Sequence, residues 1–383
     1  MPSLPLLVAL IASLSAPPAG LPSGPCDRMR GQITDSDGAR TTLTISDDTR
    51  CLSVRMTGRA EFTDDDADVK SLEPGSTFVV TESRAGGTRM LSIVERSGRL
   101  EREYTVNGAP RPSAESVEWL RGIVLDVVRA TGYGAEARVA RIRRQSGVGG
   151  VLDEVARLRS DHVRRIYLEQ LMQGGRLSEG DLRRVAQIAG QRIGSDHDKS
   201  EVLQAVTDRV EGSRDVAAAV VAAAETIGSD HDRMEVLQRM IERAPDGDAL
   251  LVDALDAARG IGSDHDRGQV LATVVGRSAL GTPAVRAAFF RALDAMGSDH
   301  DRMVVLQQVV GRDATSQETA RAVLASAARL GSDHDKSTVL LAVAARSEWM
   351  RDATTRAAFD AALKTVGSDS DYRRVREGLE RRM

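Results

Sequence analysis

The sequence GSDHDKSEVLQAV, residues 194–206, decides the fold, because its first five letters return at a fixed interval along the chain. Gly-Ser-Asp-His-Asp begins at Gly194, Gly228, Gly262, Gly297 and Gly331, and degenerate copies, RSDHV and GSDSD, begin at Arg159 and Gly367. Successive copies start 35, 34, 34, 35, 34 and 36 residues apart. In a chain of 383 residues, a period this regular indicates a repeat array rather than one compact core.

Each repeat shows the same apolar pattern after its motif. Apolar residues fall five, six and nine positions after the histidine, which places them on one helix face: Val202, Leu203 and Val206; Val236, Leu237 and Met240; Val270, Leu271 and Val274; Val305, Leu306 and Val309; and Val339, Leu340 and Val343. A second, alanine-rich helix follows in each repeat, and Thr282-Pro283 and a Thr315/Glu318 capping box mark two of its starts. Because one hairpin cannot cover its own apolar face, we predict an α-solenoid of about six or seven hairpins over residues 114–383.

The preceding residues, 27–110, have a different composition. Short β-prone runs such as TTLTIS and STFVVTES are separated by Asp37-Gly38, Gly86-Gly87, Ser97-Gly98 and Asn107-Gly108, dipeptides that close tight turns. They predict a small antiparallel β domain, so the chain as a whole is α+β and mainly α. The acidic run at residues 64–68 has Val69 and Gly75 where a calcium-binding EF-hand loop has Gly and Glu, which favours a solvated turn over a calcium site.

The N-terminus indicates the compartment. Residues 4–14, LPLLVALIASL, are an apolar run of signal-peptide length, so residues 1–20 are expected to direct export, with cleavage near Ala16 or Ala19, to the periplasm or the medium. Cys26 and Cys51 are then expected to form a disulfide. The net charge of -4 disfavours nucleic acid as a partner, and no transmembrane segment is expected in the mature chain.

Helix capping explains most of the motif without a ligand. Gly is expected to end the preceding helix in a left-handed conformation, Ser to be the N-cap, and the second Asp, at the third helical position, to bond back to the cap's own N–H. The predicted caps are Ser195 and Asp198, Ser229 and Asp232, Ser263 and Asp266, Ser298 and Asp301, and Ser332 and Asp335. The following Lys199, Arg233, Arg267, Arg302 or Lys336 is expected to pair with an Asp of the adjacent repeat.

Helix capping does not explain why the motif contains a histidine. All six histidines occupy the same repeat position, and His197, His231, His265, His300 and His334 are the candidates for a metal-binding ladder. Stacked helices lie about 10 Å apart, whereas zinc ligands lie about 2 Å from one ion, so histidines of different repeats cannot share a metal. A ladder in which His and Asp bridge neighbouring repeats is favoured, and a strip that binds a partner is the alternative.

The sequence holds no His-Glu-x-x-His, Gly-x-Ser-x-Gly, phosphate-loop or dinucleotide motif, and we expect neither enzyme activity nor a cofactor. The order helix, Gly-Ser-Asp, His, Asp, Lys or Arg, then Val-Leu resembles the HEAT-like repeats of bacterial envelope proteins. Similar repeats are fused to antirepressor-type membrane metallopeptidases, although the peptidase motif is absent here. The resemblance covers residues 114–383 and implies an exported accessory without catalytic residues.

The functional prediction is a non-enzymatic, exported scaffold that binds another protein or a peptide through its solenoid surface. Arg239, Arg243 and Gln308, on helix faces that the repeat does not dictate, are the suggested contact positions. The alternatives are a metal- or pH-responsive sensor that uses the histidines, and an accessory that regulates an envelope peptidase.

Overall fold

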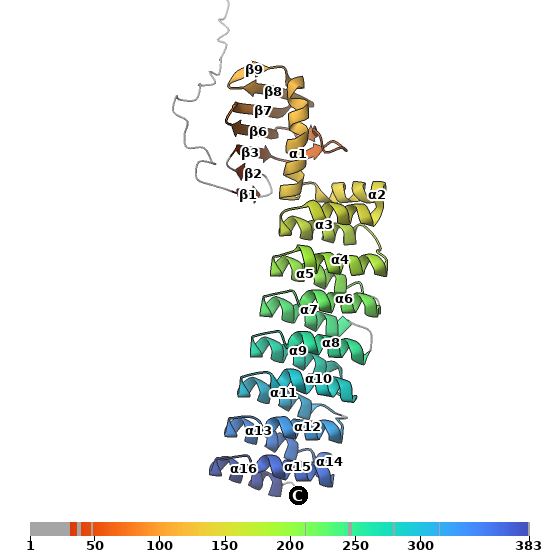
Figure 1. Cartoon of the computed structure of the whole chain (residues 1–383), viewed down its shortest axis with the longest axis vertical. Coiled ribbons are helices and arrows are strands. Elements are labelled where there is room, and N and C mark those ends of the chain that lie inside the picture. Colours follow the sequence, from red (N-terminus) through yellow and green to blue (C-terminus); the bar gives the residue numbers. More distant parts are fainter. Residues whose placement is uncertain are drawn as a thin grey trace, which may run out of the picture. The chain divides into compact units, whose positions relative to one another are not determined.

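The computed structural model describes residues 31–36, 40–46, 49–210, 212–243, 247–278, 280–313 and 315–381. It divides into two compact units, residues 1–131 and 132–383 (Figure 1). The expected signal peptide, Cys26 and the Asp37-Gly38 turn lie outside the described residues, and the Cys26–Cys51 disulfide therefore stays a prediction.

The first unit is built on an antiparallel sheet of seven strands in the order β1-β2-β3-β6-β7-β8-β9, and β4 and β5 form a separate two-stranded sheet. The strands are β1 (Gly31–Ser36), β2 (Arg40–Ser46), β3 (Arg50–Thr57), β4 (Ala60–Phe62), β5 (Val69–Leu72), β6 (Thr77–Arg84), β7 (Gly87–Arg96), β8 (Arg99–Val106) and β9 (Ala109–Arg111). Both residues of Ser97-Gly98 and of Asn107-Gly108 have positive φ, from 52° to 81°. These dipeptides therefore close the β7–β8 and β8–β9 hairpins as their sequence predicts.

Two carboxylates of the acidic run between β4 and β5 have partners within the protein. Asp65 accepts hydrogen bonds from the hydroxyl of Thr63 and the amide of Ala67, at 2.7 and 3.3 Å, and Asp68 pairs with Arg102 at 2.9 Å. The hydroxyl of Thr63 contributes most to lowering the pKa of Asp65. These carboxylates therefore organise the connection between the two strands.

The helix α1 (Val117–Thr131), preceded by the 3-10 turn η1 (Ser113–Ser116), belongs to the first unit. The indole N–H of Trp119 donates to Glu82 on β6 at 2.9 Å, and Arg50 on β3 joins Glu82 and Asp126, at 2.6 and 3.2 Å. The apolar face of α1, which includes Leu120, is buried. The helix α1 therefore packs with the sheet, and the second compact unit begins after Thr131.

The second unit is a stack of helical hairpins, as the period predicts (Figure 1). We call motif helices those that begin with the first Asp of a motif copy: α3 (Asp161–Gln173), α5 (Asp196–Thr207), α7 (Asp230–Arg243), α9 (Asp264–Arg277), α11 (Asp299–Gly311), α13 (Asp333–Ala344) and α16 (Asp369–Glu380). The second helices are α4 (Glu179–Arg192), α6 (Arg214–Ala224), α8 (Asp248–Ala258), α10 (Pro283–Asp294), α12 (Gln317–Ala327) and α15 (Ala353–Leu363). Two elements complete the unit, α2 (Ala135–Arg157), which is kinked at Gly147, and the short α14 (Ser347–Met350).

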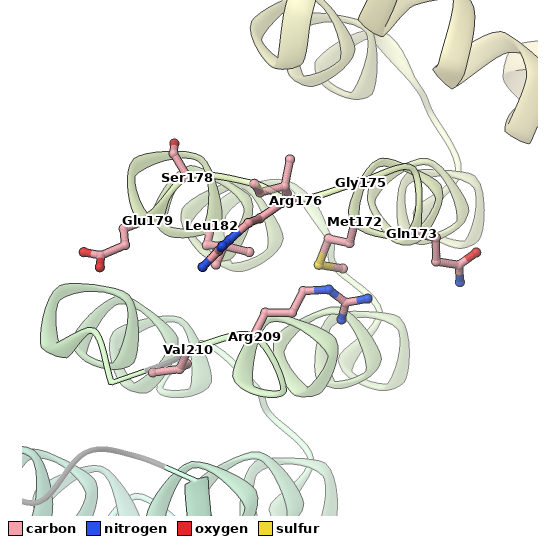
Figure 2. Close-up of a pocket in the computed structure, with 10 residues that line it drawn as sticks. Met172, Gln173, Gly175, Arg176, Ser178, Glu179, Leu182, Arg209 and Val210 are labelled. Atoms are coloured by element: carbon pink, nitrogen blue, oxygen red, sulfur yellow. The ribbon is translucent and has the colours of Figure 1, made fainter.

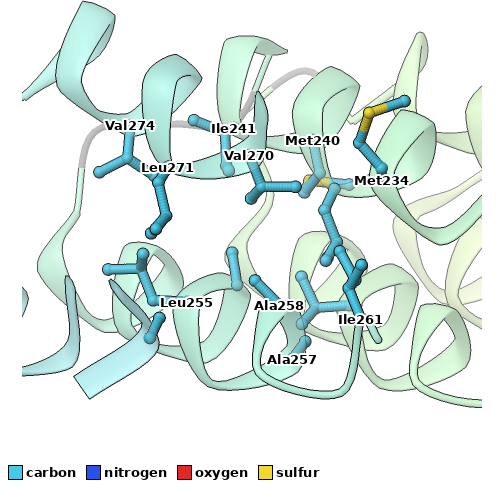
Figure 3. Close-up of a cluster of buried hydrophobic side chains, with 14 of the residues drawn as sticks. Met234, Met240, Ile241, Leu255, Ala257, Ala258, Ile261, Val270, Leu271 and Val274 are labelled. Carbon is cyan, nitrogen blue, oxygen red and sulfur yellow. The ribbon is translucent and has the colours of Figure 1, made fainter. Parts of the chain in front are cut away.

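One core runs through this stack, since each motif helix packs on the next and each second helix does the same. The fifteen predicted apolar positions of the motif helices are all buried, with at most 2% of their surface exposed. Figure 3 shows one stretch of this core, where Val270, Leu271 and Val274 of α9 lie near Leu255 of α8 and Ile241 of α7. The period of 34 to 36 residues thus determines both the helical hairpin and the face on which it stacks.

The starts of α10 and α12 test two helix caps that the sequence predicts. Thr282 is the N-cap of α10 with Pro283 at the first helical position, as predicted. The predicted Thr315/Glu318 capping box is wrong, because Ser316 caps α12 by accepting from the N–H of Thr319 at 3.2 Å. Thr315 instead donates its hydroxyl to the carbonyl of Arg312 at 2.9 Å, at the end of the preceding connection.

Candidate functional site

The serine of each motif caps its own helix. The hydroxyl of Ser298 accepts from the N–H of Asp301 at 3.2 Å, and the same bond, at 3.2 or 3.3 Å, forms in Ser195–Asp198, Ser229–Asp232, Ser263–Asp266 and Ser332–Asp335. These bonds satisfy one of the N–H groups that a helix start leaves without a helical partner. Each motif helix therefore begins at a fixed residue.

The first Asp of each motif binds the following repeat. The carboxylate of Asp299, at the start of α11, accepts from the backbone N–H groups of Gly331 and Ser332, at 2.7 and 2.8 Å, just before α13. Asp161, Asp230, Asp264 and Asp333 make the same pair of bonds to the next Gly-Ser, and Asp196 bonds Ser229. We call this series of contacts the aspartate ladder.

The aspartate ladder corrects the predicted role of the second Asp. In the described part of the chain, the carboxylates of Asp198, Asp232, Asp266, Asp301 and Asp335 do not bond back to the N–H of their own cap. That N–H is already used, because the first Asp of the preceding repeat accepts its hydrogen bond. A full capping box does form at Ser178 and Asp181, at the start of α4, where no motif precedes the helix.

The glycine of each motif has a different structural role from the predicted one. These glycines are not among the described residues with positive φ, so they do not end the preceding helix in the left-handed conformation. Instead, a Cβ at Gly331 would lie 3.0 Å from Oδ2 of Asp299, and one at Gly228 would lie 3.1 Å from Oδ2 of Asp196. Glycine therefore makes room for the carboxylate of the preceding repeat.

The Lys or Arg after each motif is more buried than the sequence suggests. Lys199, Arg267, Arg302 and Lys336 have between 4% and 7% of their surface exposed. Lys336 lies 3.5 Å from Asp333 of its own helix and donates at 2.8 Å to the carbonyl of Thr365, just after the end of α15 in the same repeat. The prediction that these cations pair with an Asp of the adjacent repeat is therefore wrong for Lys336, which binds its own Asp and the end of α15. It is confirmed for Arg302, which lies 3.4 Å from Asp294 at the end of α10 in the preceding repeat.

The arginine twelve positions after the histidine forms, in three repeats, a second ladder that the sequence analysis missed. The arginine itself is present in five repeats, as Arg209, Arg243, Arg277, Arg312 and Arg346. Arg346 donates to the carbonyls of Val310 and Arg312 at 2.7 and 3.1 Å, and Arg312 to that of Gly276 at 2.7 Å. Arg277 likewise bonds the carbonyl of Ile241. A side-chain cation thus satisfies carbonyls at the end of the preceding motif helix.

The histidines contribute little to these contacts. All six are exposed, and so is Ser370 at the same position of the last copy. His162 lies 3.9 Å from Asp198 of the next repeat, and His231 lies 3.5 Å from Glu235 of its own helix. Aspartate, rather than histidine, therefore bridges the repeats. In the part of the chain that the structure describes, no three His, Cys, Asp or Glu side chains are placed to hold a metal ion.

On three consecutive motif helices, α9, α11 and α13, the outward-facing residues between the motif and the end of the helix are all uncharged. We call this surface the neutral face, and it consists of the exposed or half-buried residues Gln269, Ala272, Thr273 and Gly276 of α9, Val304, Gln307, Gln308 and Gly311 of α11, and Thr338, Leu341, Ala342 and Ala345 at α13. Val304 is an exposed large hydrophobic residue, with 37% of its surface accessible. Because α9 packs on α11 and α11 on α13, the neutral face is continuous.

The suggested contact positions separate into two kinds. Gln308 is exposed on the neutral face. Arg239 instead forms a two-bond ion pair with Asp208 of the preceding repeat, at 2.7 and 2.8 Å, and Arg243 lies 3.8 Å from the same carboxylate. The hydrogen bonds from Arg239 lower the pKa of Asp208. Arg239 and Arg243 therefore help to join α5 to α7.

These features define a class of protein: an α-hairpin repeat protein with an antiparallel β unit at its N-terminal side. No protein-family model matches the sequence, and no curated protein matches it at a significant level. Among the helices that the structure describes, none combines the length and the apolar character needed to cross a bilayer.

Proposed function

We propose that the protein is an exported, non-enzymatic scaffold whose solenoid binds an uncharged, extended segment of another protein or peptide. The observation that carries the proposal is the neutral face, on helices α9, α11 and α13. The resemblance of the repeats to HEAT-like repeats of the bacterial envelope supports both the scaffold role and the compartment.

The stacking of the repeats does not require the neutral face. The buried Val-Leu-Val positions and the two ladders account for the packing, and the outer positions of other repeats are charged. On α5 and α7 these positions hold Glu201, Asp208, Glu235, Arg239 and Glu242. Charged side chains must be desolvated before a partner can bind, and the centres of protein interfaces are poor in them. A surface of Gln, Thr, Ala and Val loses its water at a lower cost, which favours it as the contact face.

The test is chemical crosslinking and affinity recovery of the tagged, mature protein from its native cell envelope. The variant Val304→Asp/Gln308→Glu places charge on the neutral face, and Gln187→Glu, on the exposed side of α4, is the matched control. We expect one partner to be recovered in near-stoichiometric amount with the wild type and the control, and to be lost with the double variant. Equal recovery with all three proteins would refute the neutral face as the binding surface.

A second candidate function uses the histidines, because all six are exposed at one repeat position. In this hypothesis, zinc or a change from about pH 7.5 to 5.5 acts on the histidines and changes the folding or the shape of the solenoid. Replacing all six by serine is the direct variant, since Ser368 caps α16 beside the native Ser370, accepting from Asp371 at 3.3 Å. If the sensor hypothesis is correct, zinc or acidification changes the wild type and leaves this variant unchanged.

The third candidate, an accessory that regulates an envelope peptidase, rests on the resemblance alone. It predicts that the gene lies beside one for a membrane metallopeptidase, and that this peptidase is the partner recovered.

A further inference from the structure

A hollow of about 430 Å³ lies between the end of α3, the start of α4 and the end of α5 (Figure 2). Its apolar lining includes Met172, Leu182 and Val210, which have 4%, 5% and 2% of their surface exposed. The guanidinium groups of Arg176 and Arg209 also line it. The volume is within the range of about 300–1,000 Å³ that small-molecule sites occupy.

The carbonyl bonds of the arginine ladder are made by Arg277, Arg312 and Arg346, and Arg209 beside this hollow is bonded differently. In the later repeats, the arginine twelve positions after the histidine bonds carbonyls of the preceding motif helix, as Arg346 does with Val310. Beside the hollow, Arg143 of α2 donates to the carbonyl of Leu171, near the end of α3, at 3.4 Å. Arg209 donates only to the carbonyl of Ala205, in its own helix, at 2.6 Å. Its side chain is therefore at a ladder position but does not perform the ladder's function.

The carboxylates near Arg209 have other partners. Asp208 is held by the two-bond ion pair with Arg239, and Glu179 accepts from the hydroxyl of Ser213 at 2.9 Å. A guanidinium has five N–H donors, and within the described residues Arg209 uses one of them. The hollow thus combines a buried apolar surface with a cation that can still donate.

We propose that this hollow binds a carboxylate that is attached to a short, branched apolar body. The guanidinium of Arg209 would bind the carboxylate through two parallel hydrogen bonds, and Met172, Leu182 and Val210 would contact the apolar body. Two sources present this chemistry, a free small monocarboxylic acid and the C-terminal residue of a peptide. The proposal uses none of the neutral-face residues, and it stands or falls independently of the proposed scaffold function.

The test is calorimetric titration of the full chain with 4-methylpentanoate and, as the neutral analogue, 4-methylpentanamide. A second pair, acetyl-Ala-Val-Leu with a free or an amidated carboxyl end, separates the two sources. We expect the wild type to bind at least one of the two acids and neither amide. Arg209→Gln should weaken that binding about tenfold, which corresponds to about 1.4 kcal/mol. Arg192→Gln, an exposed arginine of α4 away from the hollow, is the matched control and should bind like the wild type.

Three results would overturn the proposal: no saturable binding of either acid at millimolar concentration, equal binding of an acid and its amide, or an equal loss in Arg209→Gln and Arg192→Gln. Circular dichroism checks that each variant is folded. If Arg209→Gln unfolds, Arg209→Lys takes its place, because it keeps a cation at this position but loses the two parallel hydrogen bonds of a guanidinium. An unchanged affinity in that variant would then count against the site.

Discussion

Removing one carboxylate of the aspartate ladder should weaken one junction between repeats far more than removing its neighbour in the same motif. In Asp299→Ala, the N–H groups of Gly331 and Ser332 lose bonds of 2.7 and 2.8 Å to a carboxylate. Bonds to a charged group contribute roughly 1.5–3 kcal/mol each. Because the side chain of Asp299 is 26% exposed, we take the lower value and expect a loss of about 3 kcal/mol.

The matched control is Asp301→Ala, which removes a carboxylate from the same helix start. Asp301 faces the helix dipole, a contribution of about 0.5 kcal/mol, and the Ser298 cap remains because it uses the backbone N–H of residue 301. Urea unfolding followed by circular dichroism measures the difference. Hydrogen exchange should also show α13 and the helices after it opening earlier than α11, since each repeat is stabilised mainly by its neighbours. Equal destabilisation by the two variants would refute the assignment of the first Asp to the next repeat.

Three further predictions follow from named contacts. Hydrogen bonds from Gly367 and Ser368 lower the pKa of Asp333, so the stability that this carboxylate adds to the junction is complete above its unfolded pKa near 3.9 and is lost as the pH falls through its folded pKa. Amide hydrogen exchange of α16 should therefore become faster, relative to the rest of the solenoid, below about pH 4, and Asp333→Asn should remove this pH dependence. Lys336→Met leaves the carbonyl of Thr365 without its bond, and urea unfolding should show a loss of about 1–3 kcal/mol, whereas an unchanged midpoint would contradict the assignment. Glu82→Ala removes the acceptor of the Trp119 indole N–H, so α1 should be held less tightly to the sheet and the fluorescence emission of Trp119 should shift to the red. Glu103→Ala, on β8, is the control and should leave the emission unchanged.

The repeat itself could be predicted from the sequence, because the buried Val-Leu-Val positions recur at the period of a helical hairpin. The serine caps could be predicted for the same reason, since capping is a contact within one turn. The partner of Asp299 could not, because Gly331 and Ser332 lie more than thirty residues later and only the stacking brings them together. One signal was present in the sequence: both the Gly and the first Asp recur in every intact copy, which a local cap does not require.

Three other features could not be predicted, because they too depend on contacts between distant parts of the chain. The helix α1 has an amphipathic pattern that suits a solenoid, and its assignment to the sheet depends on the bond between Trp119 and Glu82. The arginine ladder was visible as a repeat of Arg at a fixed spacing, but its acceptors are backbone carbonyls, which leave no trace in a sequence. The hollow beside Arg209 is lined by residues from the end of α3, the start of α4 and the end of α5, which only the folded stack brings together.

The most direct test of the functional account compares the partner recovered from the envelope with three purified proteins: the wild type, Val304→Asp/Gln308→Glu, and the variant with serine at all six histidine positions. The account predicts that the double variant loses the partner, while the histidine variant keeps its stability and binds the partner like the wild type. Loss of binding in the histidine variant, with binding retained by the double variant, would contradict the account and assign the function to the histidines.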